Sequence, residues 1–369
     1  MNSIPNSAGF NLTGGKIGVL VLHGFTGSPV SIAPWAKYLN TLGYTVSAPC
    51  LPGHGSSWQQ MNKTTWQDWY KAAEQELLEL QKKCDRVFIA GFSMGGALAL
   101  RLCQIRSSEV EGLLLLNPSI HDRRLFLKLT PLLKYFISSV KKGPTDIAAP
   151  NPIKHAYHRT PLKALDSLRK LWQIVERDLY LIDLPIMVAY SINDHAVDPE
   201  NSMTVIDNIF SVDIREVIFE NSYHNVALDY DCEQLNTESK LFIQEVLSGV
   251  LKRGGDFNET DLVDAEFDSI VSGLSLDESS PTTYLDELDG IYEAERFIPP
   301  NPHRFILNKK QRLSLVGLTS SLVYLLAYNL TDFEILGLWP VVIGVSASVA
   351  NLIWDTARKD DDYEDGASI

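Results

Sequence analysis

Six short apolar runs, separated by stretches with helical spacing, dominate the chain between residues 16 and 252. Most of the runs are continuously apolar, as expected for strands that are covered on both faces. The runs are residues 17–23, 44–49, 86–91, 112–117, 185–190 and 214–220. The stretches with helical spacing are residues 32–42, 66–82, 94–105 and 237–251. This alternation predicts an α/β domain with a mostly parallel sheet flanked by helices.

The alternation stops between residues 119 and 183. No strand-like run is visible there, helix-forming segments dominate, and prolines stand at positions 131, 144, 150, 152 and 161. We expect a helical insertion in a domain that covers residues 1–253.

Negative charge is concentrated in one segment of the chain. The net charge is −14, yet residues 1–253 hold 25 acidic and 25 basic residues, whereas residues 254–296 hold 13 acidic residues and one basic residue. General affinity for nucleic acid is not expected, because phosphate binding requires a basic surface. Residues 254–302 contain too little apolar material to offset the entropy of ordering, so they are predicted to form an acidic, disordered linker.

Two apolar stretches follow within residues 303–369. Residues 313–330 and 335–354 contain no charged side chain, and each stretch is long enough to cross a bilayer. They predict a C-terminal transmembrane helical hairpin. Basic residues flank its two ends and the turn carries only acidic ones, so the positive-inside rule places the first domain on the cytoplasmic side of the cell membrane. The alternatives are a buried helical pair of a soluble domain and an amphipathic pair that lies on a surface.

The N-terminus and the cysteines agree with a cytoplasmic location. The first residues lack the basic start and the apolar run of a secretory signal. Four widely spaced cysteines, with no CxxC pair, are interpreted as reduced thiols.

Residues 91–95, Gly-Phe-Ser-Met-Gly, directly follow one predicted strand and open a predicted helix. This is the G-x-S-x-G pattern in the strand, turn and helix context that exposes a nucleophilic serine. Glycines flank the serine because side chains there would clash in the tight turn. The pattern alone also occurs by chance around turn serines, but its context favours Ser93 as a nucleophile.

A second glycine-rich turn, His23-Gly24-Phe25-Thr26-Gly27, follows the first apolar run. An oxyanion hole needs two preorganised N–H donors, and the backbone N–H groups of Phe25 and Met94 are the candidates. His23 itself is interpreted as a buried, hydrogen-bonded histidine.

A nucleophilic serine needs a base, and the base needs an orienting acid. His224 follows the last predicted strand and is therefore expected at the carboxyl edge of the sheet, where ligands collect. Asp194, after the run at residues 185–190, is the expected acid, and Asp198 is the competing carboxylate. Five other histidines are interpreted as solvated or structural: His121, His155, His158, His195 and His303.

Together with PGHG at residues 52–55, TWQDW at 65–69, NDHAVDP at 193–199 and YHNVALD at 223–229, these motifs resemble the α/β-hydrolase superfamily, specifically its bacterial carboxylesterase and monoacylglycerol lipase group. The resemblance spans residues 16–251. It implies an α/β-hydrolase fold in which residues 119–183 form a lid over an acyl-binding pocket. It also implies a nucleophile, acid and base at Ser93, Asp194 and His224, with oxyanion donors at Phe25 and Met94.

The resemblance implies a serine esterase that needs no metal or organic cofactor. The expected substrates are short or medium acyl esters or monoacylglycerol-type lipids, hydrolysed through an acyl-enzyme. An acyltransferase or thioesterase of the same fold is one alternative, since it would share the triad. A non-catalytic, membrane-anchored binding module whose acidic linker docks a basic partner is the second, although the intact set of Ser93, Asp194 and His224 argues against it.

Overall fold

The computed structural model describes residues 7–143, 145–150 and 156–253, together with separate residues near the end of the chain. The latter are residues 314, 316–317, 319–321, 324, 340–341 and 343–348. The chain divides into two compact units, Met1–Asn258 and Glu259–Ile369.

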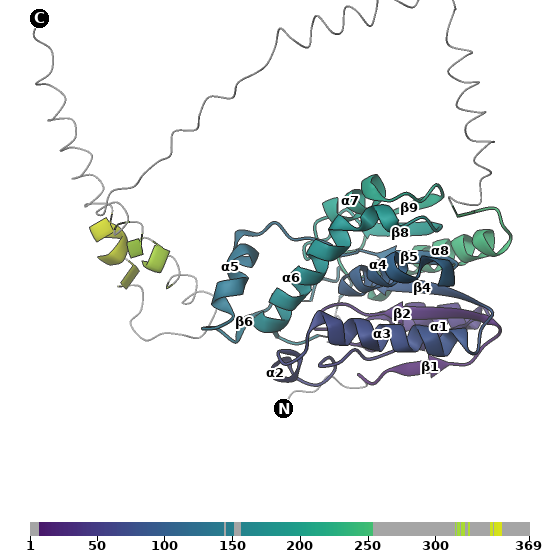
Figure 1. Cartoon of the computed structure of the whole chain (residues 1–369), viewed down its shortest axis with the longest axis horizontal. Coiled ribbons are helices and arrows are strands. Elements are labelled where there is room, and N and C mark those ends of the chain that lie inside the picture. Colours follow the sequence, from purple (N-terminus) through teal and green to yellow (C-terminus); the bar gives the residue numbers. More distant parts are fainter. Residues whose placement is uncertain are drawn as a thin grey trace, which may run out of the picture. The chain divides into compact units, whose positions relative to one another are not determined.

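A seven-stranded sheet forms the centre of the first unit, with the strand order β1-β3-β2-β4-β5-β8-β9 (Figure 1). β1 pairs antiparallel with β3 at one edge, and the other neighbours in this sheet run parallel. The mostly parallel sheet is therefore confirmed, although β1 was not predicted. The strands are β1 (Phe10–Leu12), β2 (Ile17–Leu22), β3 (Thr45–Ala48), β4 (Arg86–Phe92), β5 (Gly112–Leu116), β8 (Ile186–Ser191) and β9 (Ile214–Phe219).

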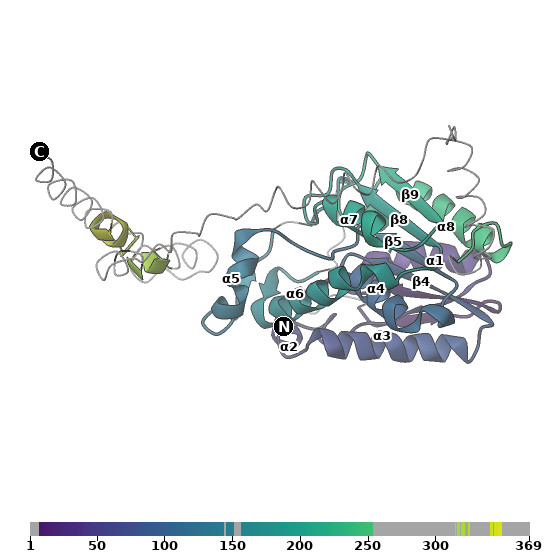
Figure 2. The same cartoon turned by 45° about the horizontal axis from the view of Figure 1, so that its top comes forward.

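Helices cover both faces of the sheet (Figures 1 and 2). On one face, α1 (Ala33–Thr41) and α8 (Cys232–Leu247) pack against the central strands, and the indole N–H of Trp35 donates to Ser239 Oγ at 2.9 Å. On the other face lie α3 (Trp66–Gln81) and α4 (Met94–Arg106), with α6 (Leu162–Arg177) packed on both. Because both faces are covered, β5 and β8 consist of buried residues throughout.

The four predicted helices correspond to α1, α3, α4 and α8. α3 begins where predicted, because Thr65 and Asp68 form a capping box at its start. α8 begins at Cys232, five residues before the predicted position 237. α2 (Trp58–Met61) and α7 (Glu200–Asn208) lie outside the predicted helices.

The insertion at residues 119–183 is only partly helical. It contains α5 (Leu125–Leu133) and α6, as expected, but β6 (Ser139–Lys141) and β7 (Arg159–Pro161) also form a small antiparallel sheet. The prediction that this interval lacks strands was therefore wrong. Three-residue strands are too short to produce the apolar run on which the prediction relied.

A buried histidine stands at the carboxyl end of β2. His23 is fully buried, its Nε2 accepts the N–H of Leu51 at 3.1 Å, and its Nδ1 lies 3.0 Å from the carbonyl oxygen of Gly24. This confirms the interpretation of His23 as a structural residue. Burial lowers the pKa of His23 to about 4. His54, whose ring centroid lies 4.9 Å away, also has a pKa well below its usual value, because of burial and the nearby His23.

Arg253, the last described residue of the first unit, is held at the amino edge of the sheet. The guanidinium of Arg253 donates to the carbonyl oxygens of Ser107 and Val110, just before β5, and pairs with Asp183, just before β8. The last described residues of this unit are therefore fixed at the opposite edge from Ser93, which follows the carboxyl end of β4.

In the second unit, the described residues are all helical, and they contact one another at small side chains. A Cβ on Gly317 would collide with Ser348 Oγ, and a Cβ on Gly344 would collide with Ser321 Oγ. Among the described residues, no helix has the length and hydropathy needed to cross a bilayer. The predicted linker at 254–302, and most of the predicted spans at 313–330 and 335–354, lie outside the described residues.

The buried His23 predicts a loss of stability in acid. Its pKa is lower in the folded protein than in the unfolded chain, so the unfolded chain binds the proton first. The contribution of His23 to the free energy of unfolding should be complete above pH 6.5. It should decrease by about 3 kcal/mol as the pH drops from 6.5 to 4. Urea unfolding at a series of pH values measures this change.

The matched variants are His23→Gln, which keeps an acceptor for Leu51 but does not titrate, and His158→Gln at an exposed position. The pH dependence should be shallower in His23→Gln and unchanged in His158→Gln. Equal pH dependence in all three proteins would contradict the assignment.

Candidate active site

Ser93 occupies a strained turn between β4 and α4. Its backbone has φ 56° and ψ −118°, outside the regions that L-residues ordinarily adopt. Its N–H donates to the carbonyl oxygen of Leu116 at 3.0 Å, and its carbonyl oxygen accepts the N–H of Ser119 at 3.1 Å. Both partners lie at the end of β5 or just beyond it, so the neighbouring strand holds the turn in its strained form.

Glycines allow this turn to pack closely. A Cβ on Gly91 would collide with the carbonyl oxygen of Gly95, and a Cβ on Gly95 would collide with that of Leu22. At Gly24, a Cβ would lie 3.2 Å from Ser93 Cβ, so the turn at residues 23–27 lies directly against Ser93. The steric argument made from the G-x-S-x-G pattern is thereby confirmed.

Asp194 and His224, which follow β8 and β9, are brought together in the structure. Asp194 Oδ2 lies 2.6 Å from His224 Nδ1, and Asp194 Oδ1 accepts the N–H groups of Ala196 and Val197, each at 2.8 Å. A carboxylate only accepts hydrogen bonds, so Nδ1 of His224 carries the proton in this contact and Nε2 is left as the basic nitrogen. The Asp194 side chain is 1% exposed, and it is held by three hydrogen bonds.

The His224 ring lies next to the turn that carries Ser93. Its centroid is 4.8 Å from that of Phe92, the residue before Ser93. Asp198, the competing carboxylate, is directed elsewhere: its Oδ1 accepts the N–H of Glu200 at the start of α7. The structure therefore brings Asp194 rather than Asp198 to His224.

One candidate oxyanion donor, Met94, directly follows Ser93 in the chain, and the other, Phe25, lies in the turn that packs against Ser93. Met94 is the first residue of α4, so its N–H has no carbonyl partner within that helix. Phe25 lies in the turn after β2, where the turn's own hydrogen bond runs from Gly27 N–H to the carbonyl oxygen of Gly24 at 3.2 Å. Neither N–H is used by these local backbone bonds.

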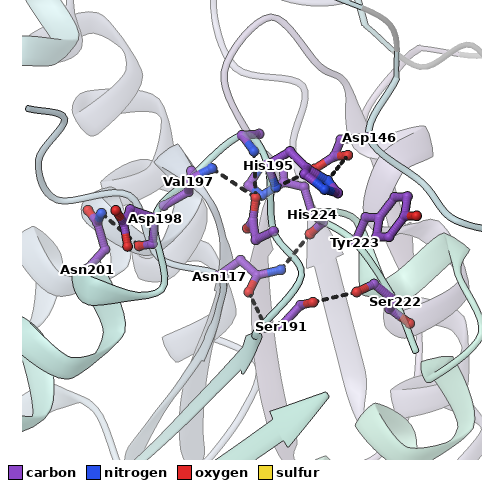
Figure 3. A network of polar contacts seen from close by, with 12 residues as sticks. Asn117, Asp146, Ser191, His195, Val197, Asp198, Asn201, Ser222, Tyr223 and His224 are labelled. Atoms are coloured by element: carbon purple, nitrogen blue, oxygen red, sulfur yellow. Dashed lines mark hydrogen bonds and ion pairs between the residues drawn. The ribbon is translucent and has the colours of Figure 1, made fainter. Parts of the chain in front are cut away.

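Sequence reasoning missed a group of polar residues that support His224. Asn117, after β5, donates to the carbonyl oxygen of His224 at 2.6 Å and accepts the N–H of Ser191 at 2.8 Å (Figure 3). Ser191, at the end of β8, in turn donates to the carbonyl oxygen of Ser222. The available signal was the position of Asn117, a polar residue at the carboxyl end of a wholly apolar strand. These contacts join the ends of β5 and β8 to the loop of His224.

Of the five histidines interpreted as solvated or structural, three lie among the described residues. His121 follows β5 and lies 3.6 Å from Glu176, and the side chain of His195 is 65% exposed. His158 is exposed, and His155 and His303 lie outside the described residues. Within the described part of the chain, no three His, Cys, Asp or Glu side chains are grouped to hold a metal ion. The four cysteines, all described, form no disulfide.

Similar sequences are found among known hydrolases. Residues 16–231 match the family described as serine aminopeptidase, S33. The chain is 33% identical over 224 residues to a thermostable monoacylglycerol lipase of Bacillus sp. (strain H-257), covering 60% of this chain and 88% of that enzyme. It is 25% identical over 241 residues to a carboxylesterase of Bacillus subtilis (strain 168), covering 64% of this chain and 96% of the esterase.

Solved structures of lipolytic enzymes are also similar to this chain. A structure described with LipS and LipT, two metagenome-derived lipolytic enzymes, has 31% sequence identity and a TM-score of 0.64, covering 66% of this chain and 100% of its own. A monoacylglycerol lipase of Paleococcus ferrophilus, at 17% identity and a TM-score of 0.55, covers 64% of this chain and 98% of its own, and it shares the fold. The family match extends over more than half of the residues, and this chain belongs to the serine aminopeptidase S33 family of α/β-hydrolases.

Proposed function

We propose that this carboxylic ester hydrolase cleaves short or medium acyl esters of the monoacylglycerol type, with Ser93 as nucleophile, His224 as base and Asp194 as the orienting acid. The observation that carries the proposal is the 2.6 Å contact between Asp194 and His224 beside the strained turn of Ser93. Asp194 fixes the imidazole with Nδ1 protonated, so Nε2 is the nitrogen that accepts the proton of Ser93.

In the first half of the proposed reaction, Ser93 Oγ attacks the ester carbonyl while its proton passes to His224 Nε2. The negative charge that develops on the carbonyl oxygen is held by the N–H groups of Phe25 and Met94. The tetrahedral species collapses when the bond to the alcohol breaks, and His224 gives its proton to the leaving alkoxide. The acyl group is then bonded to Ser93.

In the second half, water takes the place of the alcohol. His224 accepts a proton from the water, whose oxygen attacks the acyl-enzyme carbonyl, and the same two N–H groups hold the oxyanion. Collapse releases the carboxylic acid, and the proton returns from His224 to Ser93 Oγ. The four groups used in the first half therefore complete the second half as well.

The substrate class is supported by the relatives. A monoacylglycerol lipase at 33% identity and a carboxylesterase at 25% identity each align over most of their own length. Both names describe hydrolysis of a carboxylic ester. The glycerol ester of one acyl chain is the substrate common to the proposal and to the more similar of these two relatives.

Replacement of the nucleophile tests the proposal directly. Ser93→Ala should lower kcat for a monoacylglycerol and for a p-nitrophenyl ester by a factor on the order of 10⁴ or more, because covalent attack is lost. Ser108→Ala, at the opposite edge of the sheet, is the matched control and should retain wild-type rates. A fluorophosphonate probe should label the wild type but not Ser93→Ala. Full hydrolysis by Ser93→Ala would refute the assignment.

The two carboxylates of the loop after β8 provide a second test. Asp194→Asn should reduce kcat by a factor on the order of 10⁴, since the amide no longer favours the tautomer of His224 with Nδ1 protonated. Asp198→Asn should change kcat less than threefold, roughly the effect of a surface substitution. Steady-state kinetics of both variants measure the difference, and equal losses in the two would exclude Asp194 as the acid.

We further infer that residues 313–330 and 335–354 form the membrane anchor of the enzyme, with the hydrolase unit on the cytoplasmic side. Both stretches are uncharged and have the length of a bilayer span. Small residues support close packing of the pair, because Gly317 meets Ser348 and Gly344 meets Ser321. Lys309, Lys310 and other basic residues beside the stretches favour a cytoplasmic location for their outer ends.

Fractionation tests the anchor. The full chain should remain in a membrane pellet washed with alkaline carbonate, whereas a chain that ends at Arg253 should be released into the supernatant with its esterase activity intact. In intact cells, protease added from outside should leave the hydrolase unit uncleaved. Complete release of the full chain by carbonate would exclude a spanning hairpin.

A further inference from the structure

One short segment of the lid, residues 145–149, contacts the loop of Asp194 and the loop of His224 at the same time. Its polar contacts come from two carboxylates, Asp146 in the lid and Asp229 in the loop after β9 (Figure 3 shows the first). Neither carboxylate was singled out by the sequence patterns.

Asp146 binds the loop of the candidate acid through its side chain. Oδ2 of Asp146 accepts the backbone N–H of His195 at 2.9 Å, and Oδ1 lies 2.9 Å from Nδ1 of the His195 ring. His195 is the residue directly after Asp194. The Asp146 side chain is 19% exposed, so most of its water has been replaced by these two contacts.

The same residue binds the loop of the candidate base through its main chain. The carbonyl oxygen of Asp146 accepts the N–H of Asn225, directly after His224, at 3.3 Å. The His195 ring also packs edge-on against Tyr223, directly before His224, with centroids 4.6 Å apart. Asp146 thus contacts the neighbours of both partners in the Asp194 to His224 hydrogen bond.

Asp229 fastens the other end of the segment. Its carboxylate accepts the N–H groups of Ala148 and Ala149 from the lid, at 2.7 and 2.9 Å. It also accepts the N–H of Tyr223 at 2.9 Å. The lid segment and the loop of His224 therefore share one buried carboxylate, and a shift of either changes the hydrogen bonds of the other.

The lid also contacts the third loop of the site. Lys142 Nζ donates to Thr26 Oγ1 at 2.8 Å, and Thr26 directly follows Phe25, the candidate oxyanion donor. The carbonyl oxygen of Thr26 accepts the N–H of Tyr157, from the far side of the insertion. All three loops that would surround the reacting ester are thus hydrogen-bonded to the lid.

We propose that Asp146 is a positioning residue of the active site. When the lid packs against the loops of Asp194 and His224, Asp146 fixes the position of one loop relative to the other. It acts through His195 and Asn225 rather than by touching substrate, and this role rests on the function proposed above. A displacement of about 1 Å between acid and base lowers the rate by up to a hundredfold, so a residue that fixes both loops affects kcat. Substrate affinity is affected less, because Asp146 contacts protein groups.

Kinetics of lid variants test this role. Asp146→Ala should lower kcat ten- to a hundredfold with KM changed less than threefold. Asp146→Asn, which keeps an oxygen for the N–H of His195, should recover most of that loss. Asp122→Ala, which removes a lid carboxylate that among the described residues binds only its neighbour Arg124, is the matched control and should have wild-type kinetics.

His195→Ala tests the same contact with less risk of misfolding. The side chain of His195 is largely exposed, and its removal leaves the backbone N–H of residue 195 in place. His195→Ala should lower kcat less than Asp146→Ala does. The double variant should be no slower than Asp146→Ala alone, because both substitutions remove the same contact between Asp146 and His195. Additive losses, an unchanged kcat in Asp146→Ala, or a loss confined to KM would overturn the proposal.

Hydrogen exchange gives a readout that does not depend on activity. In Asp146→Ala the backbone amides of residues 222–226 should exchange faster than in the wild type, and in Asp122→Ala they should not. Unchanged exchange at residues 222–226 in Asp146→Ala would overturn the coupling of the loops. If a fluorophosphonate probe does not label Ser93 in the wild type, the proposed function is refuted. The exchange result would still show whether Asp146 couples the two loops.

Discussion

The turn at Ser93 depends on the absence of side chains at Gly91 and Gly95. Because both positions lack a Cβ, the first turn of α4 can approach the end of β2 closely. Gly95 then contacts the carbonyl oxygen of Leu22. This approach sets the positive φ of Ser93 and brings the turn at residues 23–27 against it. It also leaves the N–H of Met94 at the open end of a helix. The positions of the proposed nucleophile and of one proposed oxyanion donor thus follow from one steric constraint.

The rest of the site is organised by carboxylates that bind backbone N–H groups. Asp194 binds the N–H groups of Ala196 and Val197, and Asp229 binds those of Tyr223, Tyr230 and two lid residues. Loops carry many N–H groups without a strand or helix partner, and an ionised carboxylate satisfies several of them at once. Asp194 therefore shapes its own loop with one oxygen while its other oxygen binds His224. The candidate acid is a structural residue as well.

The sequence predicted the elements whose signals are local. The parallel strands are visible as apolar runs, and the turn at Ser93 is visible as a five-residue pattern between a strand and a helix. The proximity of Asp194 and His224 could be predicted because parallel strands end at one edge of a sheet. β1, β6 and β7 were missed, since three-residue strands owe their existence to pairing with distant residues. Asn117 and Asp146 were missed for the same reason, because their partners lie 74 and 49 residues away in sequence.

Arg253, the last described residue of the first unit, is anchored at the amino edge of the sheet. Its guanidinium binds groups just before β5 and β8, while the groups proposed for catalysis follow the carboxyl ends of β2, β4, β8 and β9. The sheet therefore stands between Arg253 and the groups proposed for catalysis. A protein fused directly after Arg253 would start on the side of the sheet away from these groups, which makes this position suitable for shortening, lengthening or exchanging the C-terminal part without altering residues 119–183.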